Sequence, residues 1–272
     1  MKKKREITDF KRLKIDLLKN YRVESNFIKF INDTDKVSKN LMKIYIERLY
    51  KIELFKKYIV YLPFPKTITE LKQQSIPLAP AINIYSAIYW EANVLKLFKK
   101  ELTKFELLRN DFEMNFVNGN FINANNILDE IQSSFGYSLW IIENRMLLIN
   151  YSEGFSELRK FVNMVLDDDN INGLLKLIVD FTSNKIDHNM NSKQYEEYIK
   201  DKFKELRKLN INPQLINYIS FKLNCRYIEP ISNYYDILSI ESDSSIIDRY
   251  ITFKQVAQQI DHKEYQDIFL ES

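Results

Sequence analysis

The sequence predicts an all-α protein built from antiparallel helix pairs. Three observations favour helices: apolar residues recur at three- and four-residue spacing, a helical segment at 121–131 recurs at 155–165, and turn residues are scarce, with 4 Gly and 6 Pro. All-β folds use turn residues at every hairpin, so this scarcity favours long helices with few loops. Hydrophobic residues make up 45% and charged residues 28% of the chain, which is typical of a globular protein with a buried core.

Residues 1–62 are expected to form an N-terminal helical segment. A first helix is predicted from apolar residues at helical spacing, which are Ile7, Phe10, Leu13, Leu17 and Tyr21. A second apolar run covers about 27–31, and the break at 33–35 offers good N-cap residues. A long helix is then predicted over 37–62, and Pro63 ends it because proline lacks the backbone amide.

A proline-rich connection is expected over residues 63–80, which hold four of the six prolines. Within it, residues 67–74 are a candidate short helix with Thr67 or Thr69 as its N-cap. Residues 81–272 are predicted to form a helical-repeat domain. The N-terminal segment either stands apart from this domain or packs with it as a single domain.

Two helices are predicted between Pro80 and Val117, with Trp90 and Phe98 inside the fold. Asn118-Gly119 is expected to end the second of them, because glycine tolerates a left-handed backbone. The next helix is predicted over 121–134, closed by Gly136, and Ser138 is expected to cap the one after it. A further helix should begin at Gly154 and end near Leu166.

The repeat relates two sets of positions at one constant offset. It maps Phe121, Ala124, Leu128 and Ile131 onto Phe155, Leu158, Val162 and Val165. The offset is about 34 residues, a length that is produced when helix–turn–helix units stack side by side. Stacked helix pairs of this kind usually form binding surfaces rather than active sites.

Two further helix pairs are predicted. The third pair is expected at 171–184 and 192–208, with Ser192 as the N-cap of its second helix. The fourth pair is expected at 213–225 and 244–260, separated by an insertion at 229–243. Pro213 suits the first turn of a helix, and Ser242, Asp243 or Ser244 is the expected N-cap of the last helix.

The segment Gly119-Asn120-Phe121-Ile122-Asn123-Ala124, with Leu128 behind it, resembles the turn and second helix of a tetratricopeptide repeat. In that family a glycine ends the first helix, an aromatic residue follows, and a small residue lets the helices approach closely. Gly119, Phe121 and Ala124 occupy these three places. The resemblance is best over residues 104–166. It implies a tetratricopeptide-like α-solenoid, a curved stack of helix pairs whose concave face binds a peptide or protein segment.

The sequence departs from the tetratricopeptide pattern at several places. Phe112 stands where the first helix usually has a small residue, and Leu158 replaces the small residue in the second copy beside Phe155. Proline does not end either second helix. These departures make the chain similar to the family without matching its full pattern.

Positive charge is concentrated at the N-terminus. Residues 1–22 carry nine basic and three acidic side chains, a net +6, whereas the whole chain has a formal charge of +3. The candidate contacts to nucleic acid or to an acidic partner are Lys2, Lys3, Lys4, Arg5, Lys11 and Arg12. The alternative, which we favour, is a solvated helix face at the chain terminus.

The sequence predicts no catalytic, cofactor-binding or metal site. Residues 168–173 match the opening of a calcium-binding EF-hand loop, but Val179 stands at the twelfth position, where a bidentate carboxylate is needed. A turn between helices, capping the helix that begins near Asn172, is the favoured interpretation. Calcium binding is the alternative.

The remaining residues with reactive side chains do not form a recognisable motif. His188 and His262 stand far apart in the sequence and in polar contexts, and Cys225 has no identifiable histidine partner. A single cysteine also excludes an internal disulfide and fits a reducing compartment. No apolar stretch is long enough to span a membrane, so we expect a cytoplasmic protein without a cofactor and without a membrane partner.

These patterns favour a protein-interaction scaffold or adaptor with a protein or peptide partner, as a subunit of a larger bacterial or phage assembly. The Ile-, Asn-, Lys- and Tyr-rich composition suits an AT-rich genome and is consistent with a defence-related system. The alternative is a nucleic-acid-binding helical protein that uses the basic N-terminus. It ranks second because the chain outside residues 1–22 is net negative. An all-α enzyme ranks third, and neither the partner nor the oligomeric state is predicted.

Overall fold

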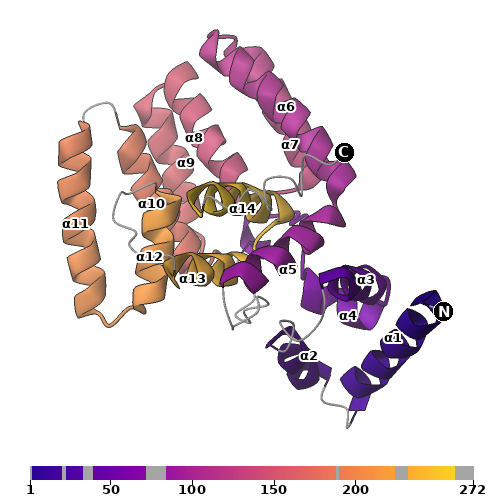
Figure 1. The fold of residues 1–272 in the computed structure, drawn as a ribbon. Helices are drawn as coiled ribbons and strands as arrows, with labels where there is room; N and C mark the ends of the chain where they lie inside the picture. The colour runs from indigo at the N-terminus through magenta and orange to yellow at the C-terminus, as the bar shows by residue number, and fades with distance from the viewer. Residues whose placement is uncertain are drawn as a thin grey trace.

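The computed structural model describes residues 2–19, 23–32, 39–71, 84–187, 190–223 and 232–260, and every regular element in these ranges is a helix (Figure 1). The all-α prediction is therefore confirmed. The N-terminal helices are α1 (Lys2–Leu18), α2 (Val23–Asn32), α3 (Lys39–Tyr50) and α4 (Glu53–Ile59), followed by a single 3₁₀ turn at Ile68–Glu70. The others are α5 (Ile84–Lys96), α6 (Lys99–Val117), α7 (Phe121–Phe135), α8 (Leu139–Ser152), α9 (Phe155–Asp167), α10 (Gly173–Ile186), α11 (Ser192–Lys208), α12 (Pro213–Lys222), α13 (Ser232–Glu241) and α14 (Ile246–Gln259).

Consecutive helices from α6 to α11 pack against one another, and α8 also packs on α10. Positions related by the repeat offset share the same burial. Ala124 and Leu158 are fully buried, and so are Leu128 and Val162. The buried stripe of α7 and that of α9 therefore use equivalent positions, because side chains four residues apart lie on one face of a helix.

Glycine ends two of these helices, as the sequence predicts. Gly119 follows α6 with φ of 75° and Gly136 follows α7 with φ of 72°, in the left-handed region that side chains rarely adopt. Gly136 also permits a close approach, because a Cβ at this position would lie 2.1 Å from the carbonyl oxygen of Pro65. The backbone amide of Tyr137 donates a hydrogen bond to the same oxygen. The turn after α7 is thus attached to the segment that follows α4.

The single long helix predicted over 37–62 is wrong, because α3 ends at Tyr50 and a new helix, α4, begins at Glu53. The break allows Phe55 and Tyr58 to stack on Phe27 of α2, with ring centroids 6.1 and 5.4 Å apart. No glycine or proline marks this break. Packing between helices therefore overrides the local preference for a continuous helix. The N-cap residues expected at 33–35 lie outside the described residues.

Two predicted N-caps are wrong by one residue. The N-cap of α11 is Asn191 rather than Ser192, because Asn191 and Gln194 form a reciprocal capping box. The N-cap of α14 is Ser245, whose hydroxyl accepts the amide of Asp248, rather than one of residues 242–244. In each case the capping side chain belongs to the residue whose backbone is extended just before the helix.

Other boundary predictions are confirmed. Ser138 caps α8 and Asn172 caps α10, each by accepting a backbone hydrogen bond, and Pro213 stands in the first turn of α12. The insertion expected at 229–243 is not structureless, because α13 occupies most of it. This helix packs against α5, α12 and α14, and these tertiary contacts stabilise a segment with little helical pattern of its own.

The described part of the proline-rich connection lies against both neighbouring regions. Phe64 packs edge-on against Phe98 with centroids 5.9 Å apart and lies 6.2 Å from the ring of Phe135. The amide of Ile246 donates a hydrogen bond to the carbonyl of Pro63. Residues 63–65 therefore contact α7 and the start of α14, whereas residues 72–83 lie outside the described ranges. Trp90 and Phe98 are buried, as predicted.

Candidate functional site

The buried polar side chains converge around α14. This helix packs against α5, α6, α8 and α13, and Figure 1 shows it in yellow near the middle of the fold. Its charged side chains reach three other helices: Asp248 bonds to α8, Arg249 to α5 and Lys254 to α6. These partners lie 109 to 158 residues away in the sequence, so α14 joins elements that the chain itself keeps far apart.

Arg249 forms a buried ion pair with Glu91 of α5. Its Nε and Nη2 donate to the two carboxylate oxygens at 2.8 and 2.6 Å, and its Nη1 donates to the carbonyl oxygen of Ile59 at 3.3 Å. This two-pronged geometry is the strongest form of an arginine–carboxylate pair. The pair links α14 to α5 and to the end of α4.

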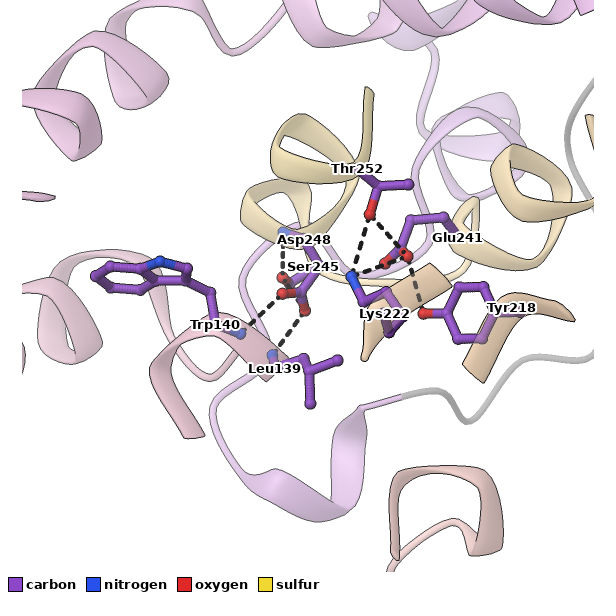
Figure 2. Close-up of polar contacts among 8 residues, drawn as sticks. All are labelled: Leu139, Trp140, Tyr218, Lys222, Glu241, Ser245, Asp248 and Thr252. Atoms are coloured by element: carbon purple, nitrogen blue, oxygen red, sulfur yellow. Dashed lines mark hydrogen bonds and ion pairs between the residues drawn. The ribbon is translucent and has the colours of Figure 1, made fainter. Parts of the chain in front are cut away.

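A second buried pair joins α12 to α13 (Figure 2). One carboxylate oxygen of Glu241 accepts hydrogen bonds from the hydroxyls of Tyr218 at 2.8 Å and Thr252 at 3.0 Å, and it lies 3.2 Å from Nζ of Lys222. Nζ of Lys222 also donates to the Thr252 hydroxyl at 3.1 Å. Burial, reinforced by the Glu241 charge, raises the pKa of Tyr218 well above its usual value, so this hydroxyl remains a donor.

Asp248 caps the N-terminus of α8 from another helix (Figure 2). Its two carboxylate oxygens accept the backbone amides of Leu139 at 2.8 Å and Trp140 at 3.1 Å, and the Ser245 hydroxyl donates to it at 2.9 Å. The first amides of a helix have no partner within the helix, and the helix dipole favours a negative charge there. One carboxylate therefore satisfies two amides of α8 and fixes its position relative to α14.

A cavity of about 480 Å³ opens beside this network, between α8, α10 and α12. Glu143, Leu147 and Tyr151 line it from one face of α8, since they are four residues apart. Lys185 of α10 and Lys222 of α12 form the opposite walls. The remaining lining residues are Thr182, Ile186, Asp187, Met190 and Leu223. The volume is within the range of small-molecule sites.

Glu143 is the acidic group in the cavity whose protonation is most perturbed. Burial is the main cause and raises its pKa from 4.5 to about 7. Lys222 and Lys185 lower the pKa, whereas Asp248 and Glu241 raise it. No residue in the described ranges donates a hydrogen bond to the Glu143 carboxyl. The group therefore changes charge near neutral pH while facing the cavity.

Both lysines on the cavity wall have partners inside the protein. Burial alone would lower the pKa of Lys222, but Glu241, Asp248 and Glu143 together raise it above the usual 10.5. Its ammonium group thus stays protonated between the acidic residues. Nζ of Lys185 donates a hydrogen bond to the carbonyl of Leu223 at 2.9 Å.

The basic residues predicted as contacts all belong to α1. Lys11 and Arg12 are exposed, and so are Lys14 and Lys19. The side chains of Lys2, Lys3, Lys4 and Arg5 lie outside the described part of the molecule. The described residues that line the cavity come from other helices, so the structure does not bring Lys11 and Arg12 to it.

The residues predicted to pack the repeat lie between helices. Ala124, Leu128 and Leu158 are fully buried, whereas Phe121 and Phe155 are partly buried. Phe121 belongs to an aromatic cluster at the tip of α6–α8, where the ring of Phe116 lies 5.8 Å from it and 5.4 Å from the ring of Tyr151. Gly119 makes the turn beside this cluster.

An apolar stripe, hereafter the α6 stripe, faces solvent along α6. It consists of Leu107, Met114 and Val117, which are 63%, 64% and 82% exposed. These residues are seven and three positions apart and lie opposite the buried Phe105 and Phe112. The α6 stripe therefore exposes three apolar side chains on the face opposite the core, with the exposed polar residues Asn110 and Asp111 between Leu107 and Met114.

The residues of the buried network were not predicted from the sequence. Glu91 stands in the apolar run Ala87–Leu95, and Asp248-Arg249 stands between Ile247 and Tyr250. A charged residue inside an apolar run is a recognisable sign of a buried ion pair. Glu143 has no comparable sign, because it is followed by Asn144 and Arg145 in the sequence, a pattern typical of the solvent-exposed face of a helix.

Among the described residues, no group of three His, Cys, Asp or Glu side chains is placed to hold a metal ion. His188, His262 and Cys225 lie outside the described ranges. In the described part of the chain, none of the helices has both the length and the apolar character that crossing a bilayer requires.

Comparison with protein-family models, with curated protein sequences and with solved structures gives no match. The candidate site is therefore interpreted from its own geometry.

Proposed function

We propose that the protein is an interaction scaffold or adaptor that binds a protein partner on a tetratricopeptide-like stack of helix pairs. The α6 stripe is the observation that carries this proposal. Monomeric proteins rarely expose large contiguous apolar patches, and those that exist often mark interaction sites. Apolar residues at i, i+7 and i+10 on a 19-residue helix present the kind of surface on which the apolar face of a partner helix packs.

The repeat positions support the stacked arrangement. Ala124 and Leu128 of α7 are buried like their counterparts Leu158 and Val162 of α9. In a tetratricopeptide-like stack, α6 and α8 would line the concave face, and α14 of the same chain packs against both of them. Part of the expected peptide-binding face is thus already covered. The partner is expected on the exposed face of α6 that carries the stripe, opposite the buried Phe105 and Phe112.

The magnitude of the burial indicates what the stripe can contribute. Covering one large apolar side chain gains about 1.5–3 kcal/mol, so three give roughly 5–9 kcal/mol before the costs of association. Association itself costs an estimated 4–15 kcal/mol. The stripe alone therefore supports weak binding, and a stable complex needs flanking contacts from the partner.

The test is native co-purification of the tagged full chain, with nuclease-treated and untreated samples compared by mass spectrometry. We expect a stoichiometric protein partner that survives nuclease and is lost in L107E/M114E. The matched control is M164E/L209E, which changes two exposed apolar residues away from α6: Met164 on α9, 59% exposed, and Leu209 directly after α11, 72% exposed. If both double variants retain the partner equally, the α6 stripe does not bind it. The identity of the partner would name the bacterial or phage assembly.

Nucleic-acid binding is a second candidate, favoured by the exposed Lys11, Arg12, Lys14 and Lys19 along α1. Co-purification of nucleic acid without a stoichiometric protein would support it. Binding that depends on phosphate contacts weakens by orders of magnitude between about 50 and 200 mM salt, and K11E/R12E should reduce the salt dependence. Binding unaffected by this charge reversal would exclude α1 as the contact.

A further inference from the structure

We propose that the cavity between α8, α10 and α12 binds a small organic cation, whose ammonium or guanidinium group pairs with the carboxylate of Glu143. This site is separate from the α6 stripe, and the inference does not depend on the adaptor proposal. It rests on three features of the cavity: an acid without a hydrogen-bond donor, lysines that are already engaged, and walls suited to an alkyl chain.

The first feature is the missing donor at Glu143. The other buried acids of the network have one: Glu91 accepts from Arg249, and Asp248 accepts from backbone amides and a hydroxyl. Glu143 lines the cavity and accepts no hydrogen bond from the described residues. Glu143 is partly exposed where it lines the cavity, so a donor supplied from the cavity can reach this acceptor.

The second feature is the charge around Lys222, which disfavours an anionic ligand at this ammonium group. Lys222 is surrounded by the carboxylates of Glu241, Asp248 and Glu143, and its Nζ already contacts Glu241 and the hydroxyl of Thr252. An anion placed against this ammonium group would also meet three carboxylates. A cation placed against Glu143 instead neutralises the acid that has no direct partner.

The third feature is the chemistry of the walls. Leu147, Ile186 and Met190 provide apolar surface for an alkyl chain, and the ring of Tyr151, which is 52% exposed, can face a cationic group. Thr182 also lines the cavity, with its hydroxyl oxygen buried.

Binding of a cation should strengthen as pH rises. Among the described residues, four charged groups act on the Glu143 carboxyl, which are Lys222 of α12, Lys185 of α10, Glu241 of α13 and Asp248 of α14, and Asp187 lies on the cavity wall after α10. With a pKa of about 7, Glu143 is mostly neutral at pH 6 and mostly ionised at pH 8. The affinity for a cation should therefore increase about 10-fold between these two pH values.

The experiment is calorimetric titration of the purified full chain with agmatine, which carries both an ammonium and a guanidinium group, at pH 6 and pH 8 and constant ionic strength. We expect saturable binding that is tighter at pH 8 and releases about half a proton at pH 7, measured in buffers of different ionisation enthalpy. E143Q should weaken binding by at least about 10-fold at pH 8 and abolish the pH dependence. The control, E196Q, removes an exposed carboxylate from α11 and should change neither the affinity nor its pH dependence.

The titration distinguishes the sources of the cation. A blocked Gly-Arg-Gly peptide that binds as well as agmatine would assign the cavity to an arginine side chain of a partner, and agmatine alone would assign it to a free amine. Succinate binding that competes with agmatine, unchanged affinity in folded E143Q, or no binding of either cation would overturn the inference. The thermal midpoint of E143Q establishes that this variant is folded.

Discussion

Substitution of Glu91 by alanine tests how much the fold depends on the ion pair to Arg249. The change removes both carboxylate acceptors of the Arg249 side chain, which is 1% exposed, and leaves only the carbonyl of Ile59 among its described partners. Breaking a buried pair by removing one partner typically costs about 3–5 kcal/mol, because the remaining charge is left in a dry environment. Domains are stable by about 5–15 kcal/mol, so E91A should lose a third or more of the total.

The double variant E91L/R249M provides the decisive comparison. Replacing both members of a buried pair by apolar residues of similar volume is often neutral or stabilising by about 1–4 kcal/mol. Here the carbonyl of Ile59 also loses its bond from Arg249, which offsets about 1–3 kcal/mol of that gain. We therefore expect the double variant to lie close to the parent protein and well above E91A in stability.

Urea unfolding followed by far-ultraviolet circular dichroism and by tryptophan fluorescence measures these differences, and Trp90 reports from the residue beside Glu91. The control is E113A, which removes the surface partner of Arg109 at 2.7 Å and should cost less than about 1 kcal/mol. If E91A costs no more than E113A, or if the double variant is no more stable than E91A, water or another group compensates Arg249 and the reasoning is refuted.

Three further substitutions test other features of the structure. Because burial raises the pKa of Glu143 from 4.5 to about 7, the folded state binds more protons than the unfolded state in this window, and stability falls as pH rises through it. E143Q should remove this dependence and be more stable than the parent above pH 7 by about 1–3 kcal/mol in urea unfolding; parallel pH profiles would contradict the assignment. D248A should cost about 3–5 kcal/mol in the same assay, because it leaves two buried amides of α8 without an acceptor, and a loss below about 1 kcal/mol would show that they are hydrated. G136A should cost several kcal/mol more than G119A: both have positive φ, but only the Cβ at Gly136 meets Pro65, whereas the space around Gly119 is open. Equal thermal midpoints for these two variants would exclude the close approach as the cause.

Local features of the fold could be predicted because their causes are local. A glycine with positive φ after α6 and α7 and a hydroxyl before α8 act on the same turn in which they stand. The apolar spacing within α7 and α9 likewise indicates their buried stripes, since the stripe of a helix is encoded in consecutive turns of sequence.

The break between α3 and α4 and the position of α13 depend on contacts that the local sequence does not contain. Phe55 turns toward Phe27 of another helix, and α13 is stabilised by α5, α12 and α14. The candidate site likewise depends on contacts between residues that are far apart in the sequence. Asp248 reaches the amide of Leu139, 109 residues earlier, and no periodicity relates two such positions.

Burial alone does not distinguish acids that stabilise the fold from acids that bind a ligand. The hydrogen-bond and ion-pair partners of each carboxylate make this distinction. Glu91 pairs with a guanidinium group, Asp248 with backbone amides, and one oxygen of Glu241 with two hydroxyls and an ammonium group, so each has direct partners within the protein. Their removal should damage folding. Glu143, by contrast, is partly exposed, accepts no hydrogen bond from the described residues and lines a cavity. Its removal should therefore leave the fold intact or strengthen it, and should change what the cavity binds. Opposite effects on stability for E143Q and D248A would thus distinguish the group available to a ligand from those that hold α14 in place.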